Sequence, residues 1–332
     1  MSDGQVVVVT GAAAGIGRAI ARRFAQDGAR VALLSRNRAG LEGARKDVEG
    51  AGGEALVLPV DVADHVAVEA AADAVEESFG AIDVWVNNAM ATIFSFFEDI
   101  DPDEFARSTE VTYFGTVWGT RSALKRMVPR DHGSIVQVGS AMAYRGIPLQ
   151  APYCGAKHAI KGFVESLRTE LRHKGSNVHV GMVQLPGLNT PQFDHGRSKM
   201  PRHPMPVPPI YQPEVAAEAV HHCAKARRRE MYVGGSAVYT IWGNKLSPIT
   251  AEIYLAKTGV SGQMTDEPVQ LPRPGNLFDA PTADEGAHGD FNDQAHPRSL
   301  QLWLTKHRRA LGGLAAAALA GGAAVCADRL RS

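Results

Sequence analysis

The chain has 332 residues, 45% of which are hydrophobic, and its 35 basic and 35 acidic residues give a formal net charge of zero. This length fits one large α/β unit with an appendage, and the hydrophobic fraction is sufficient for a buried core. The balanced charge excludes a bulk electrostatic attraction to nucleic acid or to an anionic membrane.

The N-terminal segment has the pattern of a βαβ unit. Residues 5–10 (QVVVVT) form a β-branched run of the kind that is buried on both faces in a parallel sheet. Because this run begins by Gln5, we expect no signal peptide ahead of it. Glycines at 11, 15 and 17 follow, and then a helical pattern at 16–27 and a second strand at 30–34. These elements fall within about 30 residues, as a βαβ unit requires.

The same alternation continues along the chain. Further strands are predicted at 54–59, 82–87, 134–138, 177–184 and 231–233. Helices are predicted between them at 41–49, 66–79 and 103–127, from Tyr153 onward, and at 213–226. Seven strands that alternate with helices predict a Rossmann-like, doubly wound and mostly parallel seven-stranded sheet with helices on both faces.

The composition changes after about residue 259. Residues 259–300 are rich in Pro, Gly, Asp and His without a period, which predicts an irregular tail, either laid over the surface or disordered. Residues 301–332 are again helical in pattern, and 310–327 are uncharged but mostly alanine and glycine. Two interpretations of this last segment stay open: a loosely held surface helix, or a helix that contacts a membrane.

Cysteine use indicates a reducing compartment. Cys154, Cys223 and Cys326 are scattered and odd in number, which argues against a disulfide framework. Neither the cysteines nor the histidines near Tyr153 have the spacing of metal ligands, so no metal site is predicted. We therefore expect a cytoplasmic protein, with peripheral membrane association through its last segment as the alternative.

The glycine turn after the first strand has the features of a phosphate-binding loop. Gly11, Gly15 and Gly17 lack Cβ atoms, so a pyrophosphate can approach the free N–H groups at the start of the helix. Their spacing is Gly-x-x-x-Gly-x-Gly rather than the Gly-x-Gly-x-x-Gly of the general dinucleotide fingerprint. A tight turn that serves packing alone is the other interpretation.

The candidate proton-transfer residues lie between Ser140 and Lys157. Tyr153 and Lys157 stand four positions apart in a predicted helix, so their side chains project from one face. An ammonium group in this position stabilises the phenolate and lowers the tyrosine pKa. Ser140 follows the strand at 134–138, where its hydroxyl can hydrogen-bond a substrate oxygen.

Together these motifs resemble the short-chain dehydrogenase/reductase family of the Tyr-x-x-x-Lys type. The resemblance covers residues 4–250 and rests on the order and spacing of TGAAAGIG at 10–17, Asn-Asn-Ala at 87–89, Ser140, Tyr153 with Lys157, and Pro-Gly at 186–187. It implies a dinucleotide-binding and catalytic domain at 1–258 that transfers hydride between a nicotinamide cofactor and a carbonyl or secondary alcohol.

The resemblance also implies the roles of individual residues. Ser140 would polarise the carbonyl oxygen, Tyr153 would exchange the proton, and Lys157 would lower the tyrosine pKa and bind the nicotinamide ribose. Asp61 would hydrogen-bond the adenine, although a helix cap is the other interpretation of this residue. The remaining contacts to the cofactor would come from Gly11, Gly15, Ile16, Gly17, Asn87, Ala89, Pro186, Gly187 and Thr190.

The residues after the second strand bear on the choice between NADP and NAD. An NAD site usually has a carboxylate about 20 residues after the glycines, which binds the ribose 2′-hydroxyl. Residues 34–37 read Leu-Ser-Arg-Asn instead, and Arg36 can pair with a 2′-phosphate. This predicts NADP with NAD as the alternative, unless Arg36 is an ordinary solvated arginine or stacks on adenine.

Two positions depart from the family pattern. Met90 stands where the family usually has a glycine, so a side chain enters beside the nicotinamide. Thr112 stands where the family often has an asparagine that supports a water leading to the lysine. Whether the hydroxyl of Thr112 replaces that asparagine stays open.

The substrate, partners and alternatives follow from the same resemblance. The proline-rich residues 188–212 correspond to the family's variable lid, and a hydrophobic substrate is predicted from a set of apolar residues: Met90, Ile93, Phe94, Phe96, Phe97, Met142, Tyr144, Ile147 and Leu149. A homodimer or homotetramer through helices near 105–127 and 153–172 is implied. The alternatives are a non-enzymatic dinucleotide-binding or redox-sensing scaffold and, among enzymes, a ketoacyl-thioester reductase.

Overall fold

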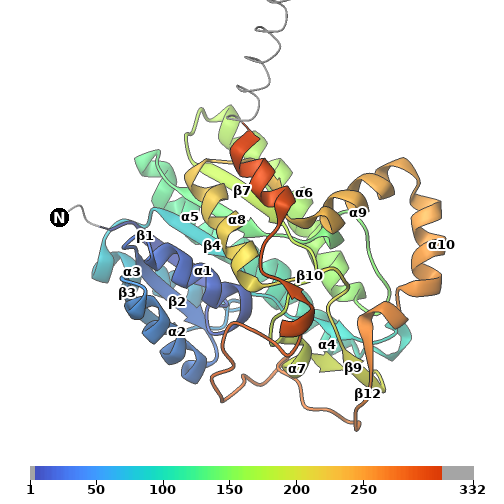
Figure 1. The fold of residues 1–332 in the computed structure, drawn as a ribbon. Coiled ribbons are helices and arrows are strands. Elements are labelled where there is room, and N and C mark those ends of the chain that lie inside the picture. Colours follow the sequence, from blue (N-terminus) through green and yellow to red (C-terminus); the bar gives the residue numbers. More distant parts are fainter. Residues whose placement is uncertain (1–3, 309–332) are drawn as a thin grey trace, which may run out of the picture.

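The computed structural model describes residues 4–308 and arranges them around a parallel seven-stranded sheet (Figure 1). Its strands are β1 (Val6–Thr10), β2 (Arg30–Ser35), β3 (Glu54–Pro59), β4 (Val84–Asn87), β6 (Ser134–Val138), β7 (His179–Gln184) and β11 (Glu230–Tyr232). Their order is β11-β7-β6-β4-β1-β2-β3, and every neighbouring pair is parallel. The predicted fold is confirmed, and the order reverses between β1 and β4.

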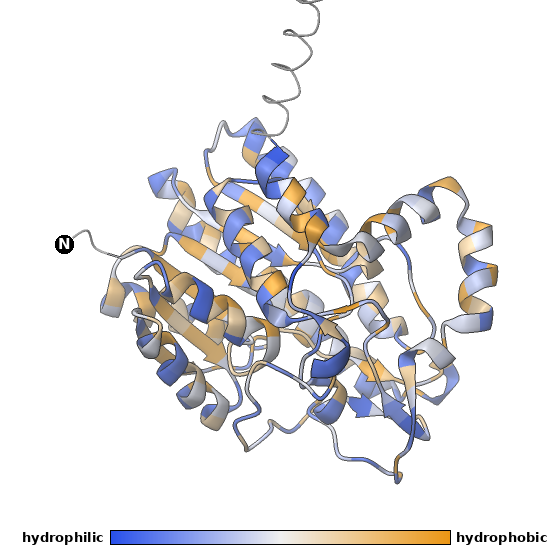
Figure 2. Ribbon diagram, viewed as in Figure 1, coloured by the Kyte–Doolittle hydropathy of each residue, from blue (hydrophilic) through white to orange (hydrophobic). Residues whose placement is uncertain are grey.

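Helices cover both faces of this sheet. They are α1 (Gly15–Ala25), α2 (Arg38–Gly50), α3 (His65–Phe79), α4 (Pro102–Thr109), α5 (Gly115–Arg130), α6 (Ala151–His173) and α8 (Pro213–Lys225). Alternate residues of β1 separate two cores, because Val7 and Val9 join the cluster of α1, α2 and α8 whereas Val6 and Val8 join that of α3, α5 and α6. Figure 2 shows these strands as strongly hydrophobic between helices with polar outer faces.

The helix expected at 103–127 is interrupted. A π-helical turn (Glu110–Phe114) separates α4 from α5. The hydroxyl of Thr112 accepts a hydrogen bond from the Ala91 N–H at 2.9 Å and donates one to the Ala91 carbonyl at 3.0 Å. These two bonds hold the π-helical turn against the segment that follows β4.

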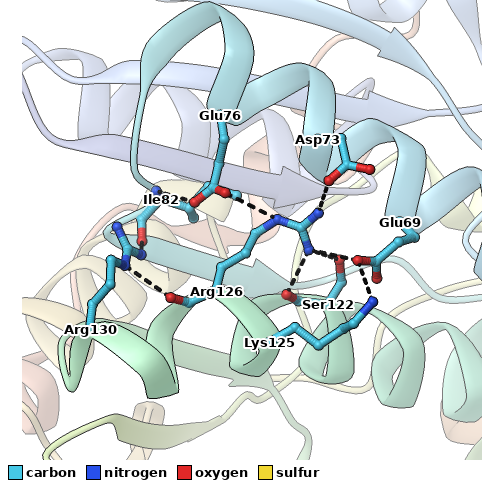
Figure 3. Close-up of polar contacts among 8 residues, drawn as sticks. All are labelled: Glu69, Asp73, Glu76, Ile82, Ser122, Lys125, Arg126 and Arg130. Atoms are coloured by element: carbon cyan, nitrogen blue, oxygen red, sulfur yellow. Dashed lines mark hydrogen bonds and ion pairs between the residues drawn. The ribbon is translucent and has the colours of Figure 1, made fainter.

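An arginine network ties α5 to α3 (Figure 3). The Arg126 side chain is only 8% exposed and pairs with Glu69 at 3.0 Å, with Glu76 at 3.4 Å and with Asp73. Lys125, on the exposed side, pairs with the same Glu69 at 2.8 Å. The network fixes the packing of the two helices that cover one face of the sheet.

Further helices and short strands follow β11. Helices α9 (Gly234–Leu246) and α10 (Pro248–Thr258) are followed by β12 (Met264–Pro268), which pairs with β9 (Arg202–Pro204), and β13 (Ala295–His296), which pairs with β10 (Ile210–Tyr211). Residues 270–294 run over the surface without regular strands, which agrees with one of the two interpretations of the tail. The short strands β12 and β13 on either side of them were not predicted.

The last described residues, 300–308, are helical, as predicted. The apolar stretch at 310–327 lies outside the described residues. Among the helices that the structure describes, none combines the length and hydropathy needed to cross a membrane. The division into a domain at 1–258 and two appendages stays a prediction.

Candidate active site

A cleft of about 320 Å³ opens at the carboxyl ends of the strands, beside the point where the strand order reverses. All but two of the predicted site residues line it: Gly11, Gly15, Ile16, Arg36, Asp61, Ala89, Ser140, Tyr153, Lys157, Pro186, Gly187 and Thr190. Residues far apart in the sequence therefore meet in one cavity.

The glycine turn approaches this cleft with bare backbone. Gly11 and Gly15 have φ angles of 66° and 56°, which favour glycine, and a Cβ on Gly11 would stand 2.9 Å from the Ala89 Cα. The Asn88 amide fixes the turn by donating to the Thr10 carbonyl at 3.0 Å. Gly15 and Ile16 open α1 and line the cleft, so the N-terminal end of that helix lies at the cleft.

Two of the predicted cofactor contacts are not in the cleft. Gly17 packs beneath the turn, where a Cβ would stand 2.1 Å from the Gly11 carbonyl oxygen. The Asn87 side chain points into the core, where it accepts from the Trp85 indole at 2.9 Å and donates to Thr120 at 3.0 Å. Its neighbour Asn88 lines the cleft instead, because successive side chains of a strand point to opposite sides.

The candidate catalytic side chains meet at the ends of β6 and α6. Ser140 follows β6 and caps the short helix after it by accepting from the Met142 N–H at 3.1 Å. Tyr153 lies in the first turn of α6, and its hydroxyl hydrogen-bonds Ser140. One turn later, Lys157 is buried and donates to the Val138 carbonyl at 2.7 Å, with its Nζ 5.4 Å from the Tyr153 ring centroid.

Burial governs the ionisation of Tyr153 and Lys157. It raises the pKa of Tyr153 to about 12, and the hydrogen bond from Ser140 offsets only part of that rise. Burial also lowers the pKa of Lys157 to about 8. The expectation that Lys157 brings the tyrosine pKa down differs from what is found here, because the desolvation of the phenolate outweighs the stabilising contacts.

The two departures from the family pattern have different outcomes. Met90 lines the cleft, as expected. The hydroxyl of Thr112 makes one accepted and one donated bond to the Ala91 backbone, as described above, and the residue is 0% exposed. Its single O–H donor is therefore already used by the Ala91 carbonyl.

Arg36 and Asp61 line the cleft just after β2 and β3. Arg36 donates to the backbone carbonyls of Phe278 at 2.7 Å and Leu277 at 3.4 Å, and also to that of Asn276. Arg36 is therefore not an ordinary solvated arginine. Asp61 pairs with Arg107 and accepts from the Ala63 N–H at 3.0 Å. The cap of α3 is Asp64 and not Asp61, since the Asp64 side chain accepts from the first N–H groups of that helix.

The other end of the cleft is apolar. Of the residues predicted to form the substrate pocket, four line the cleft: Met90, Phe94, Met142 and Ile147. The other five do not line it: Ile93 and Leu149 are core residues, Tyr144 hydrogen-bonds Glu230, and Phe96 and Phe97 are 44% and 67% exposed. The lid adds Phe193, Met205 and Val207, and α9 adds Ala237 and Tyr239.

Sequence reasoning missed several residues of the cleft wall. His195 comes from the lid, and Asn276, Pro281 and Glu285 come from the C-terminal tail. The tail has no hydrophobic period and no motif, so nothing in its sequence indicated that it reaches the site. Within residues 4–308, no group of three or more His, Cys, Asp or Glu side chains is placed to hold a metal ion.

Comparisons with known proteins agree with this geometry. A family model described as short chain dehydrogenase matches residues 5–200. The uncharacterized oxidoreductase YxnA of Bacillus subtilis is 31% identical over 321 residues, which cover 96% of this chain and 88% of that protein. Human dehydrogenase/reductase SDR family member 7 is 38% identical over 187 residues, covering 54% of this chain and 55% of that protein.

A further relative and a solved structure extend the comparison. The D-threitol dehydrogenase of Mycolicibacterium smegmatis is 33% identical over 221 residues, which cover 66% of this chain and 85% of that protein. The alcohol dehydrogenase of the archaeon Thermococcus sibiricus, solved in complex with 5-hydroxy-NADP, is similar with a TM-score of 0.60 and 27% identity. That match covers 69% of this chain and 95% of the archaeal chain.

Proposed function

The chain belongs to the short-chain dehydrogenase/reductase family, and from this membership we propose that it is an NADP-preferring enzyme that interconverts a carbonyl and a secondary alcohol. The observation that carries the proposal is the convergence of Ser140, Tyr153 and Lys157 on the cleft that also contains the glycine turn. A scaffold that only binds a dinucleotide has no need of a proton donor at that place.

The cleft fits a dinucleotide. Gly11, Gly15 and Ile16 would hold the diphosphate, since bare backbone and the N-terminus of α1 meet there. Lys157 would bind the nicotinamide ribose, and Asp61 would face the adenosine. The bound nicotinamide supplies or accepts the hydride.

Three side chains of this chain perform the proton chemistry. In reduction, the hydroxyls of Ser140 and Tyr153 hold the carbonyl oxygen, and Tyr153 gives its proton to that oxygen as the alcohol forms. Because the pKa of Tyr153 is raised to about 12, the phenol carries its proton at neutral pH and is ready to donate it. The ammonium of Lys157, one turn along α6, then stabilises the phenolate that remains.

The preference for NADP rests on Arg36. The end of β2 carries no acid that would repel a 2′-phosphate, and Arg36 is held on the cleft wall by three backbone carbonyls. A guanidinium has five N–H donors, so further donors remain for a phosphate. The archaeal structure in complex with 5-hydroxy-NADP supports the same choice.

The substrate we propose is hydrophobic. Beyond Ser140 and Tyr153, the cleft wall consists mainly of large apolar side chains from three parts of the chain: Met90, Phe94, Met142, Ile147, Phe193, Met205 and Val207. A wall of this kind binds an apolar group and leaves the polar contacts to the reacting oxygen.

A screen of nicotinamide absorbance across ketones and secondary alcohols tests the function. We expect turnover of apolar carbonyl compounds with NADPH, and a loss of about 100-fold or more in kcat for Tyr153→Phe with dinucleotide binding retained. Dinucleotide binding without any turnover would favour the scaffold. Turnover of small polar carbonyl compounds alone would overturn the proposed substrate class.

We also propose a homodimer or homotetramer that forms through α5 and α6. An apolar groove lies between these helices, lined by Val117, Leu124, Val128, Phe163 and Leu167. Grooves of this kind suit the matching face of a second copy. Light scattering after size exclusion tests this: a monomer at all concentrations would contradict it, and Leu124→Glu should reduce the mass.

A further inference from the structure

Residues 273–291, which we call the clasp, cross the mouth of the cleft. They lie outside the residues 5–200 that the family model matches. In Figure 1 the clasp is part of the orange segment that passes α7 (Gln192–His195) and runs toward α2 before it returns. Asn276, Pro281 and Glu285 of the clasp line the same cleft as the glycine turn.

One bank of the cleft anchors both ends of the clasp. Arg273 donates to the Phe193 carbonyl at 2.7 Å, and the Asn276 N–H donates to the His195 carbonyl at 2.9 Å. Glu285 pairs with His195 at 2.7 Å. All of these partners belong to the lid that follows β7.

The opposite bank holds the middle of the clasp. Arg36 donates to three successive clasp carbonyls, as described above, and the Asn37 amide donates to the Ala283 carbonyl at 2.8 Å. The Gly15 N–H donates to the Gly286 carbonyl at 3.0 Å, and Arg18 pairs with Asp284. These partners follow β2 or belong to the glycine turn and α1, so the clasp bridges the two halves of the sheet.

The clasp packs against a surface whose shape is complementary to it. A Cβ on Gly43 of α2 would stand 2.0 Å from an Asp284 carboxylate oxygen, so the absence of a side chain there makes room for that carboxylate. Leu277 is 1% exposed and joins the apolar cluster of α3, α5 and α6. The clasp is therefore packed and bonded along its length and is not a loose tail.

A dinucleotide in such a fold lies across the carboxyl ends of the strands, from the β2 side to the β7 side. The clasp spans the same two sides from above. We propose that the clasp encloses the adenosine diphosphate half of the cofactor and must open before the cofactor can enter or leave. This inference rests on the proposed function and deepens it, since it adds a wall to the dinucleotide site that the family model does not include.

Enclosure has a kinetic signature. Opening of the clasp is a step common to entry and exit, so a looser clasp raises the association and dissociation rate constants together and leaves Kd nearly unchanged. If the clasp instead competed with the cofactor for Arg36 and Gly15, loosening it would lower Kd with the dissociation rate unchanged.

Asp284→Ala is the loosening variant. It removes the pair with Arg18, which keeps its second partner Asp47 at 2.7 Å, so no buried cation is left alone. Asp266→Ala is the control, because Asp266 is fully exposed on β12 and pairs with Arg202 at 3.4 Å. Stopped-flow fluorescence of NADPH should show both rate constants raised about tenfold for Asp284→Ala and unchanged for the control.

A disulfide locks the clasp and keeps the test independent of any loss of stability in Asp284→Ala. A Cβ at Gly43 would lie 2.5 Å from the Asp284 Cγ, so Gly43→Cys with Asp284→Cys brings two sulfur atoms within bonding reach. Cys326→Ala removes a native thiol that could mispair, and Asp284→Cys alone is the control. Loaded with NADPH and then oxidised, the locked protein should retain the cofactor through desalting and release it on reduction.

The outcomes separate the two proposals. If the oxidised double variant exchanges NADPH as fast as the reduced one, or if Asp284→Ala changes Kd through one rate constant only, the clasp does not enclose the cofactor, and the proposed function stands. If the unmodified chain binds neither NADPH nor NADH, the proposed function fails and the clasp fails with it.

Discussion

The protonation of Lys157 should set an alkaline limit to activity. Its ammonium is buried, and burial lowers its pKa to about 8, whereas Tyr153 keeps its proton because its pKa is about 12. Raising the pH through 8 therefore removes the positive charge of Lys157 before the phenol ionises. The protonated fraction of a group with this pKa falls about tenfold between pH 7 and pH 9, and we expect kcat/KM to fall by the same factor.

The assay is carbonyl reduction, with kcat/KM for NADPH measured from pH 6 to pH 10. This parameter reports the ionisation of the free enzyme, to which the pKa of about 8 belongs. Lys157→Arg is the matched variant, because a guanidinium stays charged across this range. Its absolute rate should be lower, but its alkaline limb should vanish. A flat profile of the unmodified enzyme through pH 9 would refute the reasoning that the buried ammonium titrates near 8 and that its charge is needed.

Three further predictions concern other parts of the structure. Arg36→Ala should raise KM for NADPH about tenfold and leave KM for NADH nearly unchanged; equal changes would remove the phosphate pairing. Arg126→Ala should lower the free energy of unfolding in urea by about 2 kcal/mol, because three carboxylates lose a guanidinium partner that is only 8% exposed. Lys125→Ala, at a side chain that is 52% exposed, should lower it by less than about 0.5 kcal/mol. Thr112→Val should destabilise by about 1–2 kcal/mol, because both bonds to the buried Ala91 backbone are lost; an unchanged urea midpoint would contradict this.

Local backbone geometry explains why two of the predicted cofactor contacts, Asn87 and Gly17, do not line the cleft. The motif at 87–89 identified the correct strand end, but the alternation of side chains turns Asn87 into the core and Asn88 toward the cleft. Gly17 has a similar explanation, because the helix turns it beneath Gly11 while Ile16 faces the cleft. A motif identifies the segment, and the local backbone determines which of its residues line the cleft.

The tyrosine pKa shows a different limit of sequence reasoning. The spacing of Tyr153 and Lys157 fixes that they share one face of α6. It does not fix how deeply that face is buried. Here desolvation favours the neutral form of both groups, so it raises the pKa of Tyr153 and lowers that of Lys157. The interaction between a pair can be read from spacing, but its surroundings cannot.

The sequence alone determined the parallel sheet, the order of its strands along the chain and most of the cleft, because β-branched runs, glycine turns and a Tyr-x-x-x-Lys pair are local patterns with local physical causes. Only the tertiary structure decided that the irregular tail returns across the cleft, where it contacts Arg36, Gly15 and Arg18. Those contacts join residues more than two hundred positions apart through backbone carbonyls and single ion pairs. Such contacts impose no period and no composition on the chain, so they leave no signal in the sequence.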